Sequence, residues 1–260
     1  IGYTTHELDS MVRTQNWSEL LADHVPRRSM GLRQREVQEK YLITVPLDWD
    51  KKFRMPSGFL GGQNVYNLFT ELTIGYHDSI PFRELPIPFS CVSYDLISGK
   101  AVVMDSGCLP RAMRASMSIP GAFEPISENG MVLIDGGISN NFPADVVKDM
   151  GAEVIIGIDV TGGRLDEQQL RGLVDIFNQI TFFTGEEAYR HNRELVDLRI
   201  APDITGFNAA SFSAPAIDSL LVRGETAAKE KFDELIALKQ KIGISPGYMP
   251  AERKGVDMGK

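Results

Sequence analysis

The sequence predicts an α/β fold from three observations. Residues 131–134 form a short apolar run that ends at Asp135, which is typical of a buried strand. A turn, a short helical segment and a second apolar run at 153–160 follow directly. Other segments, such as 64–74, carry apolar residues at helical spacing. Because open α/β sheets place their sites at the carboxyl ends of strands, Asp135 is the first candidate for a functional residue.

Composition narrows the classes of protein to consider. The 260 residues are 43% hydrophobic and 24% charged, which is typical of a soluble globular domain. No run approaches the roughly 18 apolar residues of a membrane span. The net charge of −8 argues against nucleic acid as a partner and against simple electrostatic adhesion to anionic membranes. We expect Cys91 and Cys108 to be buried free thiols, with a disulfide between them as the alternative.

The N-terminal part carries two local signals. Thr4 and Glu7 stand at the spacing of a capping box, which predicts a short helix to about Arg13, and residues 17–21 add another turn. Residues 33–48 favour extended structure, because their second half is β-branched and aromatic.

The next segments predict a loop and then alternating elements. Residues 48–62 are rich in Gly, Pro, Lys and Arg, which predicts a surface loop, with a lid over a lipid substrate as the alternative. After this loop we expect a helix at 64–74, strands at 87–93 and 101–104, and a helix at 111–118.

The segment after Asp135 continues the same alternation. Pro143 at a helix start and Gly151 after its end bracket a helix at 144–150, before the strand at 153–160. The rest predicts a mostly helical stretch at 167–195 with a break at 184–185, a strand at 196–200, and a long amphipathic helix at 216–242. We therefore expect one domain over residues 1–242 and a Gly/Pro-rich tail or linker over 243–260.

Asp135 has two possible roles. Gly136 and Gly137 follow it, and they allow the backbone to turn sharply with positive φ and to approach a partner closely. An aspartate within hydrogen-bond reach of a serine hydroxyl can act as a general base. Alternatively, the Asp135 carboxylate caps the following turn through its own backbone. The residues alone leave both roles open.

Other polar residues fit catalysis less well. Ser116 and Ser118 lie on a predicted helix without a glycine-flanked elbow, so we expect packing and helix-end hydrogen bonding from them. Asp95 and Asp159 end predicted strands, where termination or capping is the usual role. The four histidines lack ligand spacing, so neither a metal site, a Ser-His-Asp triad nor a cofactor is predicted.

Several motifs occur together in one order. Asp135-Gly136-Gly137 is preceded by a strand ending in Asp-Leu-x-x-Gly at 90–100 and by an Ala-Ser-x-Ser-x-Pro-x-x-Phe-x-Pro stretch at 112–125. A further loop lies at 56–63. Over nearly the whole chain, these segments resemble the patatin-like phospholipase family, and the loop at 56–63 is similar to one found in its bacterial branch.

The resemblance implies a three-layer patatin-like α/β fold with a mainly parallel sheet between helices. It also implies hydrolysis of lipid acyl esters by a Ser-Asp dyad, with Asp135 as the base, Gly136 and Gly137 supporting its loop, and no cofactor. Phospholipids or lysophospholipids become the expected substrates, with transient contact at a membrane interface. The family's Gly-rich oxyanion loop and Gly-x-Ser-x-Gly elbow do not occur in these 260 residues. We therefore expect an N-terminally incomplete domain that carries the base, lacks the nucleophile, and is inactive alone.

A second class of function stays open. The chain could be a non-catalytic patatin-like module or fragment with a role in binding or assembly. Some Gram-negative relatives continue into periplasmic repeats and an outer-membrane barrel, and the tail after Ile242 would suit such a junction. A cytoplasmic location and an outer-membrane-associated or secreted one both fit the sequence. A gene without the serine elbow would favour the module.

Overall fold

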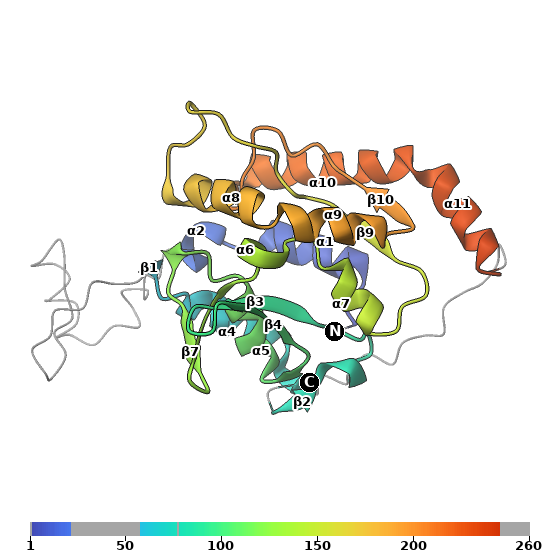
Figure 1. The fold of residues 1–260 in the computed structure, drawn as a ribbon. Helices are drawn as coiled ribbons and strands as arrows, with labels where there is room; N and C mark the ends of the chain where they lie inside the picture. The colour runs from blue at the N-terminus through green and yellow to red at the C-terminus, as the bar shows by residue number, and fades with distance from the viewer. Residues whose placement is uncertain (1, 22–57, 77, 245–260) are drawn as a thin grey trace, which may run out of the picture.

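The computed structural model describes residues 2–21, 58–76 and 78–244 of the chain. Helices and strands alternate along it, which confirms the predicted α/β class. In the view of Figure 1, helices α8, α9 and α10 lie above strand β3, and α4 and α5 lie below it. The described helices and strands thus form layers, with the strands between two sets of helices.

The largest sheet within the described residues has the strand order β4-β3-β8-β7, and every neighbouring pair is antiparallel. Its strands are β3 (Cys91–Asp95), β4 (Lys100–Met104), β7 (Ile126–Glu128) and β8 (Met131–Asp135). The mainly parallel sheet that we expected is therefore not found here. The connection from β3 to β4 is four residues and that from β7 to β8 is two, and such short connections join only antiparallel strands.

Parallel pairing occurs in two small sheets. The first pairs β1 (Gly58–Leu60) with β6 (Gly121–Phe123), and the second pairs β9 (Ile156–Ile158) with β10 (Leu198–Ile200). Two helices, α8 and α9, lie between β9 and β10 in the chain, which gives the long crossover that parallel strands need. A short antiparallel pair joins β2 (Ile80–Pro81) to β5 (Ser106–Gly107).

The N-terminal helices agree with the sequence. α1 (Thr5–Thr14) begins with a capping box, in which Glu7 N–H donates to the Thr4 hydroxyl and the Glu7 carboxylate accepts from Thr4 N–H. α2 (Trp17–Leu20) and α4 (Gln63–Leu72) also occupy predicted helical segments. The extended segment at 33–48 and most of the loop at 48–62 lie outside the described residues.

Two boundaries in the middle of the chain were wrong. The strand predicted at 87–93 is β3 and begins only at Cys91, because Pro86 and Pro88 have no backbone N–H to give to a sheet. The helix predicted at 111–118 is α5 (Leu109–Ser116), which begins two residues earlier with Pro110 in its first turn. Short 3₁₀ helices at Ile74–Tyr76 and Phe82–Glu84 were not predicted.

The long C-terminal helices divide more than expected. α8 (Leu173–Thr184) and α9 (Glu186–Glu194) meet at Gly185, which confirms the predicted break. α8 starts at Leu173 rather than 167, because the Asp166 carboxylate accepts from Gln168 N–H and Gln169 N–H in a separate turn. The helix predicted at 216–242 is two helices, α10 (Ala214–Glu230) and α11 (Phe232–Lys241). The tail residues 245–260 lie outside the described part.

A buried cluster supports the β3 side of the sheet. Phe82, Leu85, Leu109 and Ala112 form this cluster, and Cys91 packs against it. Cys91 and Cys108 are free, as expected, although each is only partly buried. Burial raises the pKa of the Cys91 thiol to about 12. Among the described residues, none of the helices is long and apolar enough to span a bilayer.

Candidate active site

Asp135 is the last residue of β8, and the chain passes from it into the short helix α6 (Gly137–Asn140). Its backbone N–H donates to the carbonyl oxygen of Ser118 at 3.0 Å. Its Oδ1 accepts the backbone N–H of Gly137 at 2.8 Å, which is the turn-capping role that the sequence left open as the alternative. Asp135 Oδ2 accepts no hydrogen bond from the described part of the chain. The cap therefore uses one oxygen of the carboxylate and leaves the other without a donor among the described residues.

The two glycines act through space rather than through unusual dihedral angles. Gly136 has φ −73° and ψ −15°, and Gly137 is not among the residues with positive φ, so the expected left-handed turn is absent. A Cβ on Gly136 would overlap the carbonyl oxygen of Val92. A Cβ on Gly137 would lie 2.8 Å from Asn141 Oδ1 and 3.0 Å from Asp135 Oδ1. The close backbone approach that the sequence suggested is thus the reason for both glycines.

The Asp135 carboxyl is protonated more readily in the folded chain than an aspartate exposed to water. Burial raises the pKa of its carboxyl to about 6, and the hydrogen bond from Gly137 N–H opposes this rise only in part. A base whose pKa lies near the working pH takes up and releases a proton most effectively. Asp135 therefore has the proton affinity of a general base at near-neutral pH.

A ring of three polar side chains holds the segment after Asp135. Asn140 Nδ2 donates to Asp145 Oδ1 at 2.9 Å, and Asn192 Nδ2 donates to Asn140 Oδ1 at 3.0 Å. Asn192 Oδ1 accepts the backbone N–H of Asp145 at 2.8 Å and so closes the ring. Asn192 lies on α9 and is 1% exposed. Sequence reasoning missed it, because its partners lie 47 and 52 residues away and no local pattern indicates such a contact.

The two rival serines have structural partners. Ser116 Oγ donates to the carbonyl oxygen of Val92 at 2.7 Å. Ser118 is fully buried, accepts from Arg114 Nη1 at 2.8 Å, and donates to the carbonyl oxygen of Arg114 at 3.0 Å. Both hydroxyls are therefore engaged in packing and helix-end bonds, which confirms the roles predicted for them.

Asp95 also stabilises the backbone. Its carboxylate accepts the N–H groups of Ile97, Ser98 and Val132, and so caps the β3–β4 turn and ties it to β8. The Ser98 side chain together with these backbone donors lowers the pKa of Asp95 to about 2.

Asp159 has a similar structural role at the end of β9. Burial alone would raise the pKa of Asp159, but hydrogen bonds from Tyr189, Thr161 and Arg199 outweigh it, so the pKa is lowered. The Tyr189 hydroxyl and Arg199 Nε each donate to Asp159 Oδ2 at 2.6 Å. Asp159 Oδ1 also accepts the backbone N–H of Thr161 at 2.9 Å, which confirms the predicted capping role.

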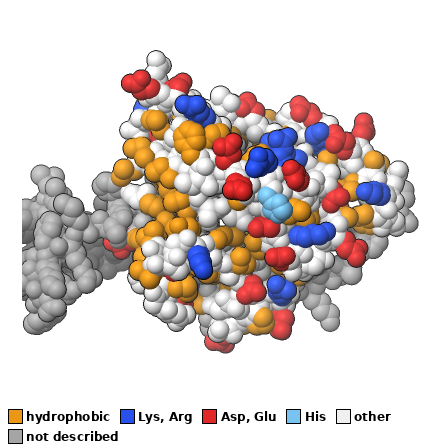
Figure 2. All heavy atoms as spheres, in the orientation of Figure 1, with side chains coloured by type: hydrophobic (Ala, Val, Ile, Leu, Met, Phe, Trp, Pro, Cys, Tyr) orange, Lys and Arg blue, Asp and Glu red, His pale blue; other side chains and the backbone are white. Residues whose placement is uncertain are grey.

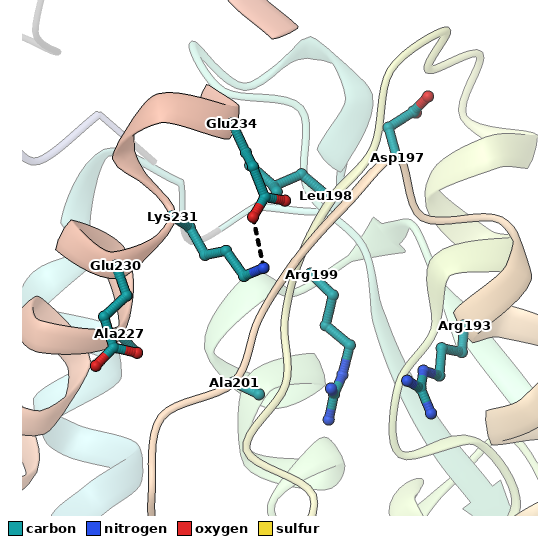
Figure 3. Close-up of a pocket in the computed structure, with 9 residues that line it drawn as sticks. All are labelled: Arg193, Asp197, Leu198, Arg199, Ala201, Ala227, Glu230, Lys231 and Glu234. Carbon is teal, nitrogen blue, oxygen red and sulfur yellow. Dashed lines mark hydrogen bonds and ion pairs between the residues drawn. The ribbon is translucent and has the colours of Figure 1, made fainter. Parts of the chain in front are cut away.

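A cavity of about 360 Å³ lies between β10 and the junction of α10 with α11 (Figure 3). It is lined by side chains of both charges, namely Arg193, Asp197, Arg199, Glu230, Lys231 and Glu234. Lys231 Nζ pairs with Glu234 Oε1 at 2.6 Å, and Asp135 is not among the lining residues. This cavity is therefore separate from the candidate base. The described residues contain no group of three or more His, Cys, Asp or Glu that could hold a metal ion.

Comparison with known proteins assigns the chain to a family. The family model described as "Patatin-like phospholipase" matches residues 8–148, more than half of the chain, and the match includes Asp135 and both glycines. The chain belongs to the patatin-like phospholipase family. This membership agrees with the layered α/β fold and with the resemblance carried by the sequence motifs.

The similar family members are longer proteins. Patatin-like phospholipase domain-containing protein 7 of Rattus norvegicus is 31% identical over 161 residues, which is 60% of this chain and 11% of the rat protein. Patatin-like phospholipase domain-containing protein 6 of Homo sapiens is 39% identical over 90 residues, 34% of this chain and 6% of the human protein. An uncharacterized NTE family protein of Mycobacterium bovis is 36% identical over 83 residues, 32% of this chain and 23% of the bacterial protein. The chain thus spans less than a quarter of each of these three relatives.

Proposed function

We propose that this chain is the base-carrying part of a lipid acyl-ester hydrolase of the phospholipase or lysophospholipase type. The observation that carries the proposal is the Asp135 carboxylate. It ends a strand in a crowded glycine turn, its pKa is raised to about 6, and one oxygen lacks a hydrogen-bond donor among the described residues. The family to which the chain belongs supports the same reading.

In the proposed reaction, Asp135 removes the proton from a serine hydroxyl as the serine oxygen forms a bond to the ester carbonyl carbon. The tetrahedral intermediate then expels the alcohol, which takes the proton back from Asp135. Water, deprotonated by the same carboxylate, then attacks the acyl-serine. The second tetrahedral intermediate expels the serine oxygen, which takes the proton back from Asp135, and the fatty acid is released. No metal or organic cofactor enters these steps.

The serine and its oxyanion loop belong, in this proposal, to a segment that these 260 residues do not include. No Gly-x-Ser-x-Gly sequence occurs among them, and the elbow is needed to expose a serine at a strand-to-helix turn. Ser116 and Ser118 are bound to the backbone and to Arg114, which argues against either as a substitute.

An apolar helix face beside the candidate site supports a lipid substrate. Four residues of α8 at helical spacing are about half exposed, namely Leu173, Ile176, Ile180 and Phe183. Hydrophobic side chains gather on the side of the molecule where α8, β1 and β7 lie, whereas the opposite side mixes acidic and basic groups (Figure 2). The C-terminal end of α8 contacts α6, because Thr184 Oγ1 donates to the carbonyl oxygen of Ile138. We infer transient contact of the α8 face with a membrane interface during turnover.

The decisive experiment is the intact mass of the protein expressed from its native gene, before and after reaction with a fluorophosphonate probe. A polypeptide that is heavier than the 28.8 kDa of this chain and gains one adduct would support the hydrolase. Peptide mapping should then locate the adduct on a Gly-x-Ser-x-Gly serine. A polypeptide of 28.8 kDa without an adduct would reject it.

A non-catalytic module is the second candidate, and the missing serine elbow is the observation that favours it. If the native polypeptide contains no elbow and no probe-reactive serine, Asp135 serves only as the cap of its own turn. A role in binding or assembly would then replace hydrolysis.

A further inference from the structure

Ser93 is one of the buried polar residues whose side chain lacks a partner within the described residues. It lies on β3 and is 0% exposed. Its hydroxyl makes no hydrogen bond within the part of the chain that the structure describes. Burying an unpaired hydroxyl destabilises a protein, and native structures keep few such groups without a reason.

The place of Ser93 in the sheet indicates a reason. Ser93 pairs directly with Asp135 in the antiparallel register of β3 and β8. Opposite residues of an antiparallel pair point to the same face, with Cβ atoms about 4.5–5.5 Å apart. Rotation about the Cα–Cβ bond of serine moves the hydroxyl among three staggered positions. The Ser93 hydroxyl, which has no acceptor among the described residues, therefore lies opposite the Asp135 carboxylate, which has one oxygen without a donor.

We propose that Ser93 is a positioning residue for Asp135, and that its hydroxyl donates a hydrogen bond to the ionised carboxylate. This bond holds the carboxylate in one orientation together with the bond from Gly137 N–H, which is already formed. Because a carboxylate oxygen has two lone pairs, the contact leaves room for a proton taken from another hydroxyl. The catalytic consequence rests on the proposed function, whereas the hydrogen bond itself does not.

Several charged or titratable groups lie on the elements packed against Asp135. The charged or titratable groups on the elements packed against it are Cys91, Tyr94 and Asp95 of β3, Arg111 and Arg114 of α5, and Glu128 of β7. Tyr94 points to the opposite face from Ser93, since side chains alternate along a strand. Arg111 pairs with Glu128 at 3.2 Å, and Arg114 donates to Ser118. α6 contains no titratable side chain.

The test is a ¹³C NMR titration of the Asp135 carboxyl in the 260-residue chain and in Ser93→Ala, with the resonance assigned from Asp135→Asn. Losing one hydrogen bond to the ionised form should raise the pKa of Asp135 by about one unit. Ser127→Ala is the matched control, because Ser127 is exposed on the neighbouring strand β7. The control should leave the pKa of Asp135 unchanged.

Thermal unfolding gives a second readout that simple packing would not produce. A protonated Asp135 carboxyl accepts hydrogen bonds more weakly than a carboxylate, so the buried Ser93 hydroxyl is poorly paired below pH 5. In that pH range Ser93→Ala should therefore stabilise the protein. That gain should shrink or vanish above pH 7, where the ionised carboxylate would lose its partner. An unchanged or lowered pKa, or a gain in unfolding temperature of equal size at every pH, would overturn the proposal.

Ester hydrolysis by the native polypeptide separates the two claims. If the pKa of Asp135 rises in Ser93→Ala but the wild-type polypeptide hydrolyses no lipid ester, the Ser93 contact stands and the hydrolase function fails. If the wild type hydrolyses esters and the pKa does not move, only the role of Ser93 is wrong.

Discussion

Thr184 Oγ1 donates to the carbonyl oxygen of Ile138 at 2.6 Å, and this bond joins the last residue of α8 to the short helix that follows Asp135. In the same short helix, Asn140 is held by Asp145 and by Asn192 of α9. The segment after the candidate base is therefore fixed by two helices that are distant in sequence. Its geometry should therefore depend on residues of α8 and α9.

We expect Asn192→Ala to weaken both stability and activity. The change leaves Asp145 N–H and Asn140 without their partner in a buried site, which costs about 1–3 kcal/mol of unfolding free energy. If α6 is held less rigidly, kcat of the native polypeptide that contains the catalytic serine should fall more than KM changes. Urea denaturation and initial rates test this, with exposed Asn67→Ala as the control. Full activity in Asn192→Ala would show that the ring does not position Asp135.

Asp135→Asn should remove activity and make the folded chain more stable at neutral pH. The native carboxyl has a pKa of about 6, against 3.8 for an unperturbed aspartate, so the folded protein binds more protons between these values. Its stability therefore falls as pH rises from about 4 to 6, by up to about 3 kcal/mol. Asparagine removes this loss, so the advantage of the variant should be small at pH 4 and complete at pH 7.5. Exposed Glu153→Gln should behave like the wild type, and equal advantages at both pH values would contradict the assignment.

The pH dependence of turnover should report the same carboxyl. Asp135 must be ionised to accept a proton, so kcat/KM should rise with pH through a midpoint near the pKa of about 6 and then level off. Asp135→Asn should lower the plateau by about 10²–10⁴-fold. A soluble short-chain ester is the suitable substrate, because its presentation does not depend on lipid ionisation. A midpoint at pH 4 would indicate that another, less buried carboxylate is the base.

Gly136→Ala should damage the site without adding charge or much volume. The new Cβ meets the carbonyl oxygen of Val92, and the resulting strain should cost about 1–3 kcal/mol of unfolding free energy and most of the activity. Gly162→Ala is the matched control, because a Cβ there meets nothing within 4 Å and φ is not positive. Thermal unfolding of the two variants compares them directly. Equal midpoints would show that β3 can move aside.

The exposed face of α8 should matter only when the substrate is aggregated. We expect Ile176→Gln combined with Ile180→Gln to lower hydrolysis of phospholipid vesicles by tenfold or more. The reason is that each aliphatic side chain that becomes buried in the membrane interface contributes about 1.5–3 kcal/mol to binding. Turnover of a monomeric short-chain ester should stay close to wild type. Phe232→Gln on α11, which is 60% exposed, controls for loss of an apolar surface residue elsewhere. Parallel loss on both substrates would place the defect in folding.

Local signals in the sequence were reliable where short-range chemistry decides the structure. The capping box at Thr4 and Glu7, the break at Gly185 and the strand ending in Asp135 all occur as predicted. The β7–β8 hairpin was not predicted, although the sequence carries a signal for it. That signal is the pair Asn129-Gly130, and both residues adopt positive φ in the two-residue turn between the strands. Recognising that pair would also have predicted antiparallel pairing for β8.

Other features had no local signal to find. α10 ends at Glu230 without a glycine or proline, and Lys231 N–H bonds back to the carbonyl oxygens of Ala228 and Lys229. The partners of Asn192 and the register of Ser93 with Asp135 depend on how distant segments pack. Sequence periodicity can assign a residue to a face, but it does not determine which residue lies opposite.

The contact at Gly136 has a consequence for how this protein can evolve. The atom that a Cβ would meet is the backbone carbonyl oxygen of Val92, so no exchange of the Val92 side chain can make room for it. A lineage that accepted alanine at position 136 would have to shift the whole strand β3, and with it Ser93 and the Asp95 cap. We therefore expect descendants that keep this sheet to inherit glycine at position 136, even where other residues of the turn change.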